Sequence, residues 1–211
     1  MKAAVLEALD RIVVKDAADP VCGDDEAVLE VDECAVCGSD LRSYLYGNDR
    51  VKPPAVIGHE IAERVLRAGA AVTRVKVGDR VALGADVPCG TCHWCTTGRG
   101  TNCRINYAIG YQFPGGFQQR MLLNATTLAY GPVTPLPDGL SFAEAALAEP
   151  LACALNGLEL AQFGIGKSIC IIGLGPIECM MLELSRVFGA SRVFAAQRSR
   201  ARLDMARRFL P

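Results

Sequence analysis

The sequence predicts a chain of mixed class, with a β-rich first domain followed by the beginning of a parallel α/β domain. Up to about residue 140, short segments rich in β-branched residues are separated by Gly, Pro and Asp, which is typical of a compact barrel or sandwich. Beyond Ser141, apolar strand patterns alternate with helical ones, and this alternation indicates βαβ units. With 211 residues, 51% of them hydrophobic, the chain can bury a sizeable core.

The β-rich domain is expected over residues 1–150. Its predicted strands are bounded by turn-forming residues and lie at 3–9, 11–16, 27–36, 74–83 and 118–131. After them, the stretch SFAE from Ser141 to Glu144 is a capping-box pattern that opens a helix. Pro150 marks a break or a second helix start, and the helical pattern then runs to Gly164.

The remaining residues, 151–211, predict an incomplete doubly wound domain. A strand at 167–175, a helix at 176–190, a strand at 192–197 and a helix at 200–210 follow one another. A doubly wound nucleotide-binding fold has about six strands, and two strands cannot bury both faces of a parallel sheet. We therefore expect this chain to be a piece of a longer protein.

Charge and composition exclude several classes of partner. The formal net charge of -1 gives no electrostatic footprint for nucleic acid or an anionic membrane surface. Glu7, Asp10 and Lys15 interrupt the N-terminal apolar residues, so the segment does not resemble a signal peptide. Several of the ten cysteines, such as Cys153 and Cys170, stand singly in apolar runs. This usage predicts reduced thiols in the cytoplasm.

Four cysteines lie within one loop at about 88–104, with the spacing C-x2-C-x2-C-x7-C. Four thiolates so spaced can close a tetrahedron around Zn²⁺ and leave no place for a substrate, which predicts a structural site. Free or disulfide-linked cysteines and an iron-sulfur cluster are the alternatives. His93 is a further possible ligand, although a solvated loop side chain is the simpler interpretation. The predicted ligands are Cys89, Cys92, Cys95 and Cys103.

A second, dispersed set of ligands consists of Cys37, His59 and Glu60. A thiolate, an imidazole and a carboxylate form a three-ligand site with one open position, which is how catalytic zinc is held. From these residues alone, core packing is the more common explanation of a cysteine and a histidine 22 positions apart.

Seven motifs, in this order along the chain, make the sequence resemble a known protein family. They are CGSD from Cys37, GHE from Gly58, KVGDRV from Lys76, the four-cysteine loop, GGF from Gly115, AEPLAC from Ala148 and GLGPI from Gly173. Together they resemble the zinc-dependent medium-chain alcohol dehydrogenase family, closest to its sorbitol-type and threonine dehydrogenase branch. The resemblance implies a GroES-like catalytic domain, a Rossmann domain, a structural zinc, and a catalytic zinc at Cys37, His59 and Glu60.

The resemblance also implies an activity: oxidation of a secondary alcohol, polyol or sugar-like, with hydride passing to NADP or NAD. Glu149 falls where relatives place a group at or near the zinc, and a helix-end carboxylate is its alternative role. Ser39 falls where relatives place a proton-passing hydroxyl, and a turn residue is its alternative role. Arg42 stands where many relatives carry a relay histidine, and arginine cannot deprotonate. Asp40 is expected to orient a zinc ligand or to cap the following helix.

The nucleotide-binding expectation rests on the glycine turn after the strand at 167–175. Gly173, Gly175, Pro176 and Ile177 resemble a dinucleotide fingerprint, although Glu178 takes the place of its third glycine. At the end of the second strand, Gln197 replaces the acidic residue that holds the ribose hydroxyl of NAD, and Arg198 and Arg200 follow it. This predicts NADP over NAD. The alternative is a solvated basic helix face.

Three hypotheses of different classes follow. The chain is a piece of an active oxidoreductase, a zinc-binding homologue without activity, or an unrelated zinc-ribbon interaction protein. The third fails because the chain lacks basic character and carries the six other motifs. Family members are usually dimers or tetramers, so a homo-oligomer is a possible state.

Overall fold

The computed structural model describes residues 1–208, and the chain divides into one unit at Met1–Glu149 and a second unit from Pro150 onward. The strands are β1 (Lys2–Ala8), β2 (Arg11–Asp16), β3 (Ala27–Ala35), β4 (Glu60–Ala68), β5 (Arg80–Leu83), β6 (Asp86–Val87), β7 (Tyr107–Ala108), β8 (Arg120–Leu123), β9 (Val133–Pro135), β10 (Ser168–Ile172) and β11 (Arg192–Ala196). The helices are α1 (Gly38–Tyr46), α2 (His93–Thr96), the 3-10 turn η1 (Gly100–Asn102), α3 (Ala125–Tyr130), α4 (Phe142–Ala145), α5 (Ala148–Leu160), α6 (Pro176–Val187) and α7 (Arg200–Ala206).

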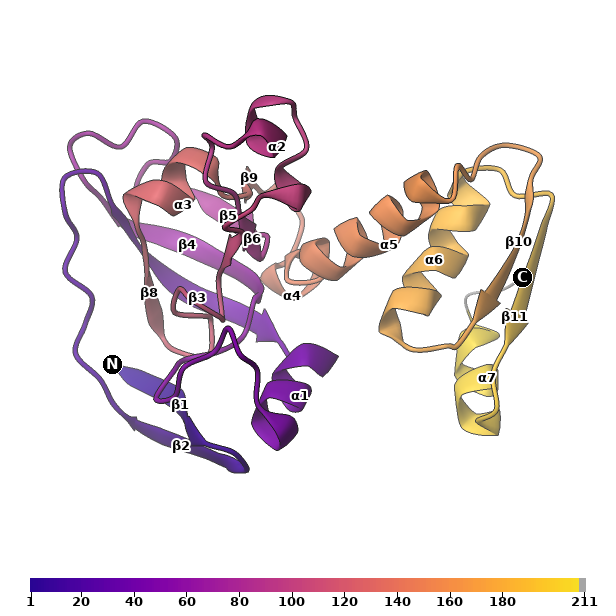
Figure 1. Ribbon diagram of the computed structural model, residues 1–211, viewed down its shortest axis with the longest axis horizontal. Coiled ribbons are helices and arrows are strands. Elements are labelled where there is room, and N and C mark those ends of the chain that lie inside the picture. Colours follow the sequence, from indigo (N-terminus) through magenta and orange to yellow (C-terminus); the bar gives the residue numbers. More distant parts are fainter. Residues whose placement is uncertain (209–211) are drawn as a thin grey trace. The chain divides into compact units, whose positions relative to one another are not determined.

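The first unit is built on a five-stranded antiparallel sheet in the order β8-β3-β4-β5-β9 (Figure 1). Alternate residues of each strand point to the same face, so apolar residues two apart form one continuous core. On β4, for example, Ile61 and Val65 enter this core, whereas Ala62 packs on the opposite face with residues of α4. The sheet thereby fixes both ends of β3 and β4, and the candidate site lies at one of those ends.

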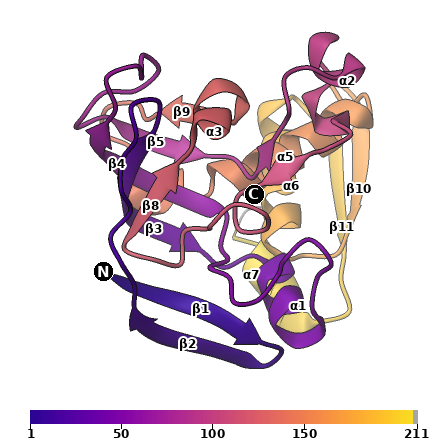
Figure 2. The same cartoon turned by 60° about the vertical axis from the view of Figure 1, so that its left-hand side comes forward.

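Two small hairpins complete the first unit. The β1–β2 hairpin lies outside the main sheet (Figure 2), and isolated bridges tie Ala3 to Gln118 and Leu6 to Ala55. In the second hairpin, β6 precedes the cysteine loop and β7 follows it. The two strands are antiparallel, and Val87 pairs with Tyr107. This pairing closes the base of the loop.

The predicted fold class is confirmed: a β-rich unit precedes the start of a parallel α/β segment. Two strand predictions were wrong in part. Within the segment 74–83, only Arg80–Leu83 form a strand of the sheet. The segment 118–131 is a strand only at Arg120–Leu123, after which Asn124 accepts a 2.8 Å hydrogen bond from the Thr127 N–H and starts helix α3. The asparagine cap overrides the β-branched residues that follow it.

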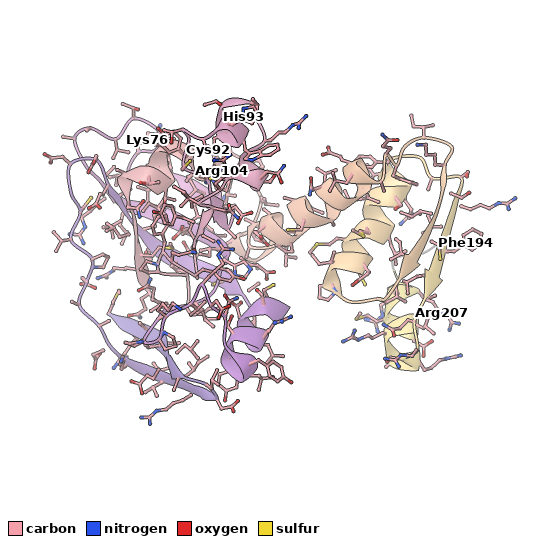
Figure 3. All side chains as sticks on the ribbon, viewed as in Figure 1. Lys76, Cys92, His93, Arg104, Phe194 and Arg207 are labelled. Carbon is pink, nitrogen blue, oxygen red and sulfur yellow. The ribbon has the colours of Figure 1, made fainter. Side chains whose placement is uncertain are left out.

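The second unit contains β10 and β11, which are parallel and in register from Ser168–Arg192 to Ile172–Ala196. Its core is formed by Ile171, Leu174 and Leu182 with neighbours on β11 and α7. The other face of the two strands is uncovered: Ile172 is 82% exposed and Phe194, labelled in Figure 3, is 54% exposed. Within the described residues the sheet is thus one-sided, as two strands require.

Helix α4 starts where its predicted cap places it. Ser141 and Glu144 form the expected capping box of α4, and α5 begins at Ala148 with Pro150 in its first turn. Helix α5 ends at Leu160 rather than at Gly164, because Gln162 adopts a positive φ of 52°. Helix α7 spans Arg200–Ala206, and the end of the predicted 200–210 helix lies outside the described residues.

None of the helices within residues 1–208 combines the length and apolar character needed to cross a bilayer.

Candidate metal centres

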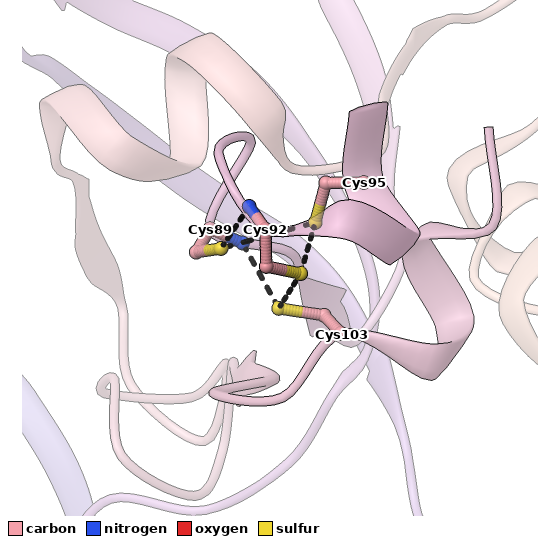
Figure 4. A group of neighbouring side chains, drawn as sticks. All are labelled: Cys89, Cys92, Cys95 and Cys103. Carbon is pink, nitrogen blue, oxygen red and sulfur yellow. Dashed lines mark hydrogen bonds between the residues drawn. The ribbon is translucent and has the colours of Figure 1, made fainter. Parts of the chain in front are cut away.

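The four cysteines of the loop face one another across a small gap (Figure 4). Their sulfur–sulfur distances are 3.5 Å for Cys92–Cys95, 3.9 Å for Cys89–Cys95 and 4.0 Å for Cys92–Cys103. A disulfide needs about 2.05 Å, whereas the edge of a ZnS₄ tetrahedron with Zn–S bonds of about 2.3 Å measures about 3.8 Å. The spacing of the sulfurs therefore fits a four-coordinate ion and excludes disulfides among these cysteines.

Backbone N–H groups stabilise negative charge on these sulfurs. The N–H of Cys89 and the N–H of Asn106 both donate to the Cys103 sulfur at 3.3 Å. Hydrogen bonds from Thr91, and from the backbone of Cys92, lower the pKa of Cys89 to about 6, whereas burial and the neighbouring thiols raise the pKa of Cys95 to about 12. Four adjacent thiols can all ionise only if a cation is shared between them.

His93 lies outside this centre. Its side chain is exposed at the start of α2, and its ring packs edge-on against Trp94 at 5.5 Å between centroids (Figure 3). The metal-competent group contains the four cysteines and no histidine.

The dispersed centre forms where β3 and β4 meet. These strands are antiparallel, and Ala35 pairs with Glu60. The pairing brings Cys37, two residues beyond β3, next to His59 and Glu60 at the start of β4. One ligand atom from each of Cys37, His59 and Glu60 lies within 4.8 Å of the others. The chain separation of 22 residues is thus closed by strand register, and one thiolate, one imidazole and one carboxylate can share an ion.

The backbone conformation of Gly58 fixes the position of the neighbouring His59. It has a φ of +94°, and a Cβ there would lie 2.7 Å from the Phe117 ring and 2.9 Å from the Cys34 sulfur. A larger residue would be strained and would displace the loop. The glycine before the histidine is therefore required by both backbone angle and space.

Asp40 contacts both chain segments that form the dispersed centre, the one at Cys37 and the one at Gly58 and His59. One of its oxygens, Oδ2, accepts a 2.9 Å hydrogen bond from the Cys37 N–H, and Oδ1 accepts one of 3.2 Å from the Gly58 N–H. The same Oδ1 lies 3.5 Å from Nδ1 of His59. Asp40 thus caps α1 and also faces the imidazole, which leaves Nε2 of His59 for a metal.

The dispersed centre is strongly anionic. Burial alone lowers the pKa of His59, but the negative charges of Asp40, Glu149 and Cys37 outweigh it and raise that pKa to about 9. Burial raises the pKa of Glu60, while His59 opposes that shift. Nδ1 of His59 is buried and faces the Asp40 carboxylate at 3.5 Å. The donor set and its charge fit a divalent cation.

Two further predicted site residues are Ser39, two positions after the ligand Cys37, and Glu149, whose charge acts on His59. The Ser39 hydroxyl is buried and has no hydrogen-bond partner within residues 1–208. Glu149 lies in the first turn of α5 and is near enough to His59 to raise its pKa. Arg42, in contrast, is exposed on α1.

Sequence reasoning missed two residues beside the centre. The ring of Tyr111 lies 5.7 Å from the His59 ring between centroids, and the Arg50 guanidinium lies 5.1 Å from the Tyr111 centroid. Both residues come from loops without a motif, and only their position in space connects them to His59.

Comparison with known proteins decides the family. Residues 23–137, more than half of the chain, match the family described as Alcohol dehydrogenase GroES-like domain. The chain belongs to the zinc-type medium-chain alcohol dehydrogenases. It is 32% identical over 212 residues to the sorbitol dehydrogenase of Bacillus subtilis strain 168, covering 99% of this chain and 59% of the relative.

Two solved structures of this family share the fold. A zinc-binding dehydrogenase from Sinorhizobium meliloti 1021 bound to NADP is 32% identical with a TM-score of 0.89, over 99% of this chain and 59% of that chain. Galactitol-1-phosphate dehydrogenase from Escherichia coli is 28% identical with a TM-score of 0.91, over 100% of this chain and 59% of that chain. This chain thus spans about 59% of the length of these relatives.

The glycine turn after β10 differs from an open phosphate-binding site. Gly173 has a φ of +104°, and Gly175 is the N-cap of α6, followed by Pro176 and Ile177. An Oε2 atom of Glu178 accepts a 2.8 Å hydrogen bond from the Gly175 N–H. A carboxylate therefore already satisfies part of the helix N-terminus at which a pyrophosphate would bind.

At the end of β11, the side chain of Gln197 turns back on the backbone. Its Oε1 accepts hydrogen bonds from the N–H groups of Arg198 at 2.7 Å and Ser199 at 3.3 Å. No carboxylate stands at this position, which leaves Arg198 and Arg200 as the charged residues nearby in sequence.

Proposed function

We propose that this chain acts in zinc-dependent oxidation of a secondary alcohol, a polyol or sugar-like compound, with hydride passing to NADP in preference to NAD. The observation that carries the proposal is the convergence of Cys37, His59 and Glu60 within 4.8 Å. Three protein ligands of this kind leave one coordination position open, as catalytic zinc requires.

Each residue of the dispersed centre has a distinct task. When bound there, zinc supplies Lewis-acid activation that makes the hydroxyl of an alcohol easier to deprotonate. Asp40 keeps Cys37 and His59 in place through the contacts described above. The buried hydroxyl of Ser39 has no hydrogen-bond partner within the described residues. It can therefore accept a hydrogen bond from the substrate hydroxyl and relay its proton, releasing its own proton as it receives one. Arg42 is permanently protonated and cannot extend this path.

The cysteine loop has a structural task. Its four thiolates close the coordination shell of a zinc ion, so no position remains for a substrate. The bound ion would hold the loop together in place of a hydrophobic core. Of the four loop cysteines, Cys103 is the buried one. Cysteines that stand singly in apolar runs, such as Cys170, suit a reducing compartment such as the cytoplasm.

Names of relatives support the substrate and cofactor classes. The similar proteins include a sorbitol dehydrogenase and a galactitol-1-phosphate dehydrogenase, both of which are polyol enzymes by name. A similar zinc-binding dehydrogenase was crystallised with NADP. Gln197 in place of an acidic residue, with Arg198 beside it, supports the same cofactor choice.

The test is a reaction followed by the absorbance of the reduced nicotinamide. The zinc-loaded chain is mixed with NADP and a panel of polyols, and we expect turnover that disappears in His59→Ala and persists in Lys76→Gln. Lys76 is an exposed cation between β4 and β5 and belongs to neither ligand group. Undiminished turnover by His59→Ala would contradict the proposal.

One observation favours a second candidate, a zinc-binding homologue without hydride transfer. The Glu178 carboxylate occupies the N–H of Gly175, and this negative charge opposes a dinucleotide phosphate at the same place. Titration of the chain with NADPH, followed by nucleotide fluorescence, separates the two candidates. Saturable binding supports the enzyme, and its absence at millimolar NADPH supports the homologue.

A further inference from the structure

A cavity of about 500 Å³ opens between two loops of the first unit, 50–56 and 111–118. Its polar lining consists of Arg50, Lys52, Tyr111, Gln112 and Gln118. Amides and a phenol are groups that bind sugar hydroxyls, and the volume is that of a small-molecule site. The cavity therefore has both the size and the polar groups to hold a small polar substrate.

The charge of this cavity has one sign. Arg50 and Lys52 are its charged lining residues, and no carboxylate lines it. Neither cation takes part in an ion pair within residues 1–208. Arg50 is partly buried and Lys52 is exposed, so both cations are accessible to an anionic ligand in the cavity.

Arg50 is held in a fixed orientation. Its Nη2 donates to the backbone oxygen of Asn106 and, at 3.4 Å, to Oε1 of Gln112. Its guanidinium lies over the Tyr111 ring at 5.1 Å. A guanidinium carries five N–H donors, so the remaining donors of a pre-oriented fork are available to a ligand.

The same contacts connect the cavity to the dispersed metal centre. Tyr111 lines the cavity, and its ring also packs against His59 at 5.7 Å. The Arg50 guanidinium is thus two ring contacts away from a metal ligand. Tyr111 therefore belongs both to the lining of the cavity and to the surroundings of His59.

We propose that Arg50 and Lys52 bind an anionic group of the substrate, and that this group is a phosphate monoester at the end of a polyol. This inference rests on the function proposed above and narrows its substrate class. Two cations match the double charge of a phosphate monoester better than the single charge of a carboxylate. A neutral polyol would leave both cations unpaired, which is how a polar site rejects a substrate that lacks the matching group.

The test is calorimetric binding to the zinc-loaded full chain without nicotinamide. The probes are glucitol 6-phosphate, gluconate, glucitol and inorganic phosphate. We expect glucitol 6-phosphate to bind at least about tenfold more tightly than glucitol and more tightly than gluconate. The double variant Arg50→Gln with Lys52→Gln should lose this preference, because charged hydrogen bonds carry it. The control double variant Arg11→Gln with Lys76→Gln removes two exposed cations elsewhere and should keep the preference.

Equal affinity for glucitol and its phosphate, or an unchanged preference in the Arg50/Lys52 variant, would overturn the proposal. Tighter binding of gluconate than of glucitol 6-phosphate would overturn the phosphate assignment. The variant Cys37→Ser separates this test from the proposed function, because Cys37 does not line the cavity. Inorganic phosphate should bind Cys37→Ser as it binds the unaltered chain even where the dispersed metal and turnover are lost.

Discussion

Glu63 is a buried carboxyl group without a hydrogen-bond partner among residues 1–208, and its replacement by leucine should stabilise the first unit. It lies on β4 between the core residues Ile61 and Val65, is 0% exposed, and neither side-chain oxygen has a hydrogen-bond partner within residues 1–208. Burial, followed by the negative charge of Asp32, raises its pKa well above the ordinary value. The folded protein therefore holds this side chain protonated over a range in which the unfolded chain ionises it.

The size of the effect follows from these facts. An unsatisfied buried polar group costs about 1–3 kcal/mol, so Glu63→Leu should raise the free energy of unfolding by about that amount at low pH. The raised pKa adds a pH dependence, in which stability is fully present below the unfolded pKa of about 4.3 and is lost as pH rises toward the folded pKa. Within this window the loss approaches about 1.4 kcal/mol per pH unit. Glu63→Gln cannot titrate and should lack this slope.

Trp94 provides the assay. It is the single tryptophan of the chain and belongs to the first unit, so urea unfolding followed by its fluorescence reports on that unit. Curves for the zinc-loaded wild type, Glu63→Gln and Glu63→Leu are compared from pH 5 to pH 8. Glu30→Gln, an exposed change on β3, is the matched control and should keep the wild-type slope. Parallel pH dependence of wild type and Glu63→Gln would refute the reasoning, as would destabilisation by Glu63→Leu.

Three further changes test other parts of the structure. Asp40→Asn removes the charge facing His59 and should weaken zinc binding at the dispersed centre about 10- to 100-fold in chelator competition; unchanged affinity would show that Asp40 is only a helix cap. Glu178→Gln removes the carboxylate charge at the Gly175 N–H and should tighten NADPH binding about tenfold by fluorescence titration, whereas Glu183→Gln on α6 should not; weaker binding would contradict a blocking role. Asn124→Ala removes the cap of α3 and should lower the unfolding free energy by about 1 kcal/mol in urea, and an unchanged midpoint would argue against the cap.

Local sequence patterns were sufficient to predict the elements that depend only on neighbouring residues. The capping box at Ser141 and Glu144 and the glycine turn at Gly173 were found where their residues predicted. Strand β4 was not predicted, because Glu63 in a core position and charged residues such as Arg64 and Arg67 hide its alternation. Periodicity detects apolar faces, and a buried carboxyl group breaks that signal.

The candidate site shows the same division. The cysteine loop was predictable because its four ligands lie within one short segment. Cys37 and His59 are brought together by the register of β3 on β4, which no local pattern specifies. The contact of Tyr111 with His59, and of Arg50 with Tyr111, depends on how two loops pack, so neither residue could be assigned from sequence.

Zinc content per chain tests the dispersed centre most directly. Two zinc ions are expected in the unaltered protein, one in Cys37→Ser and one in Cys92→Ser, because each variant destroys one of the two ligand groups. A single ion in the unaltered protein that disappears in Cys92→Ser and persists in Cys37→Ser would show that Cys37, His59 and Glu60 hold no metal.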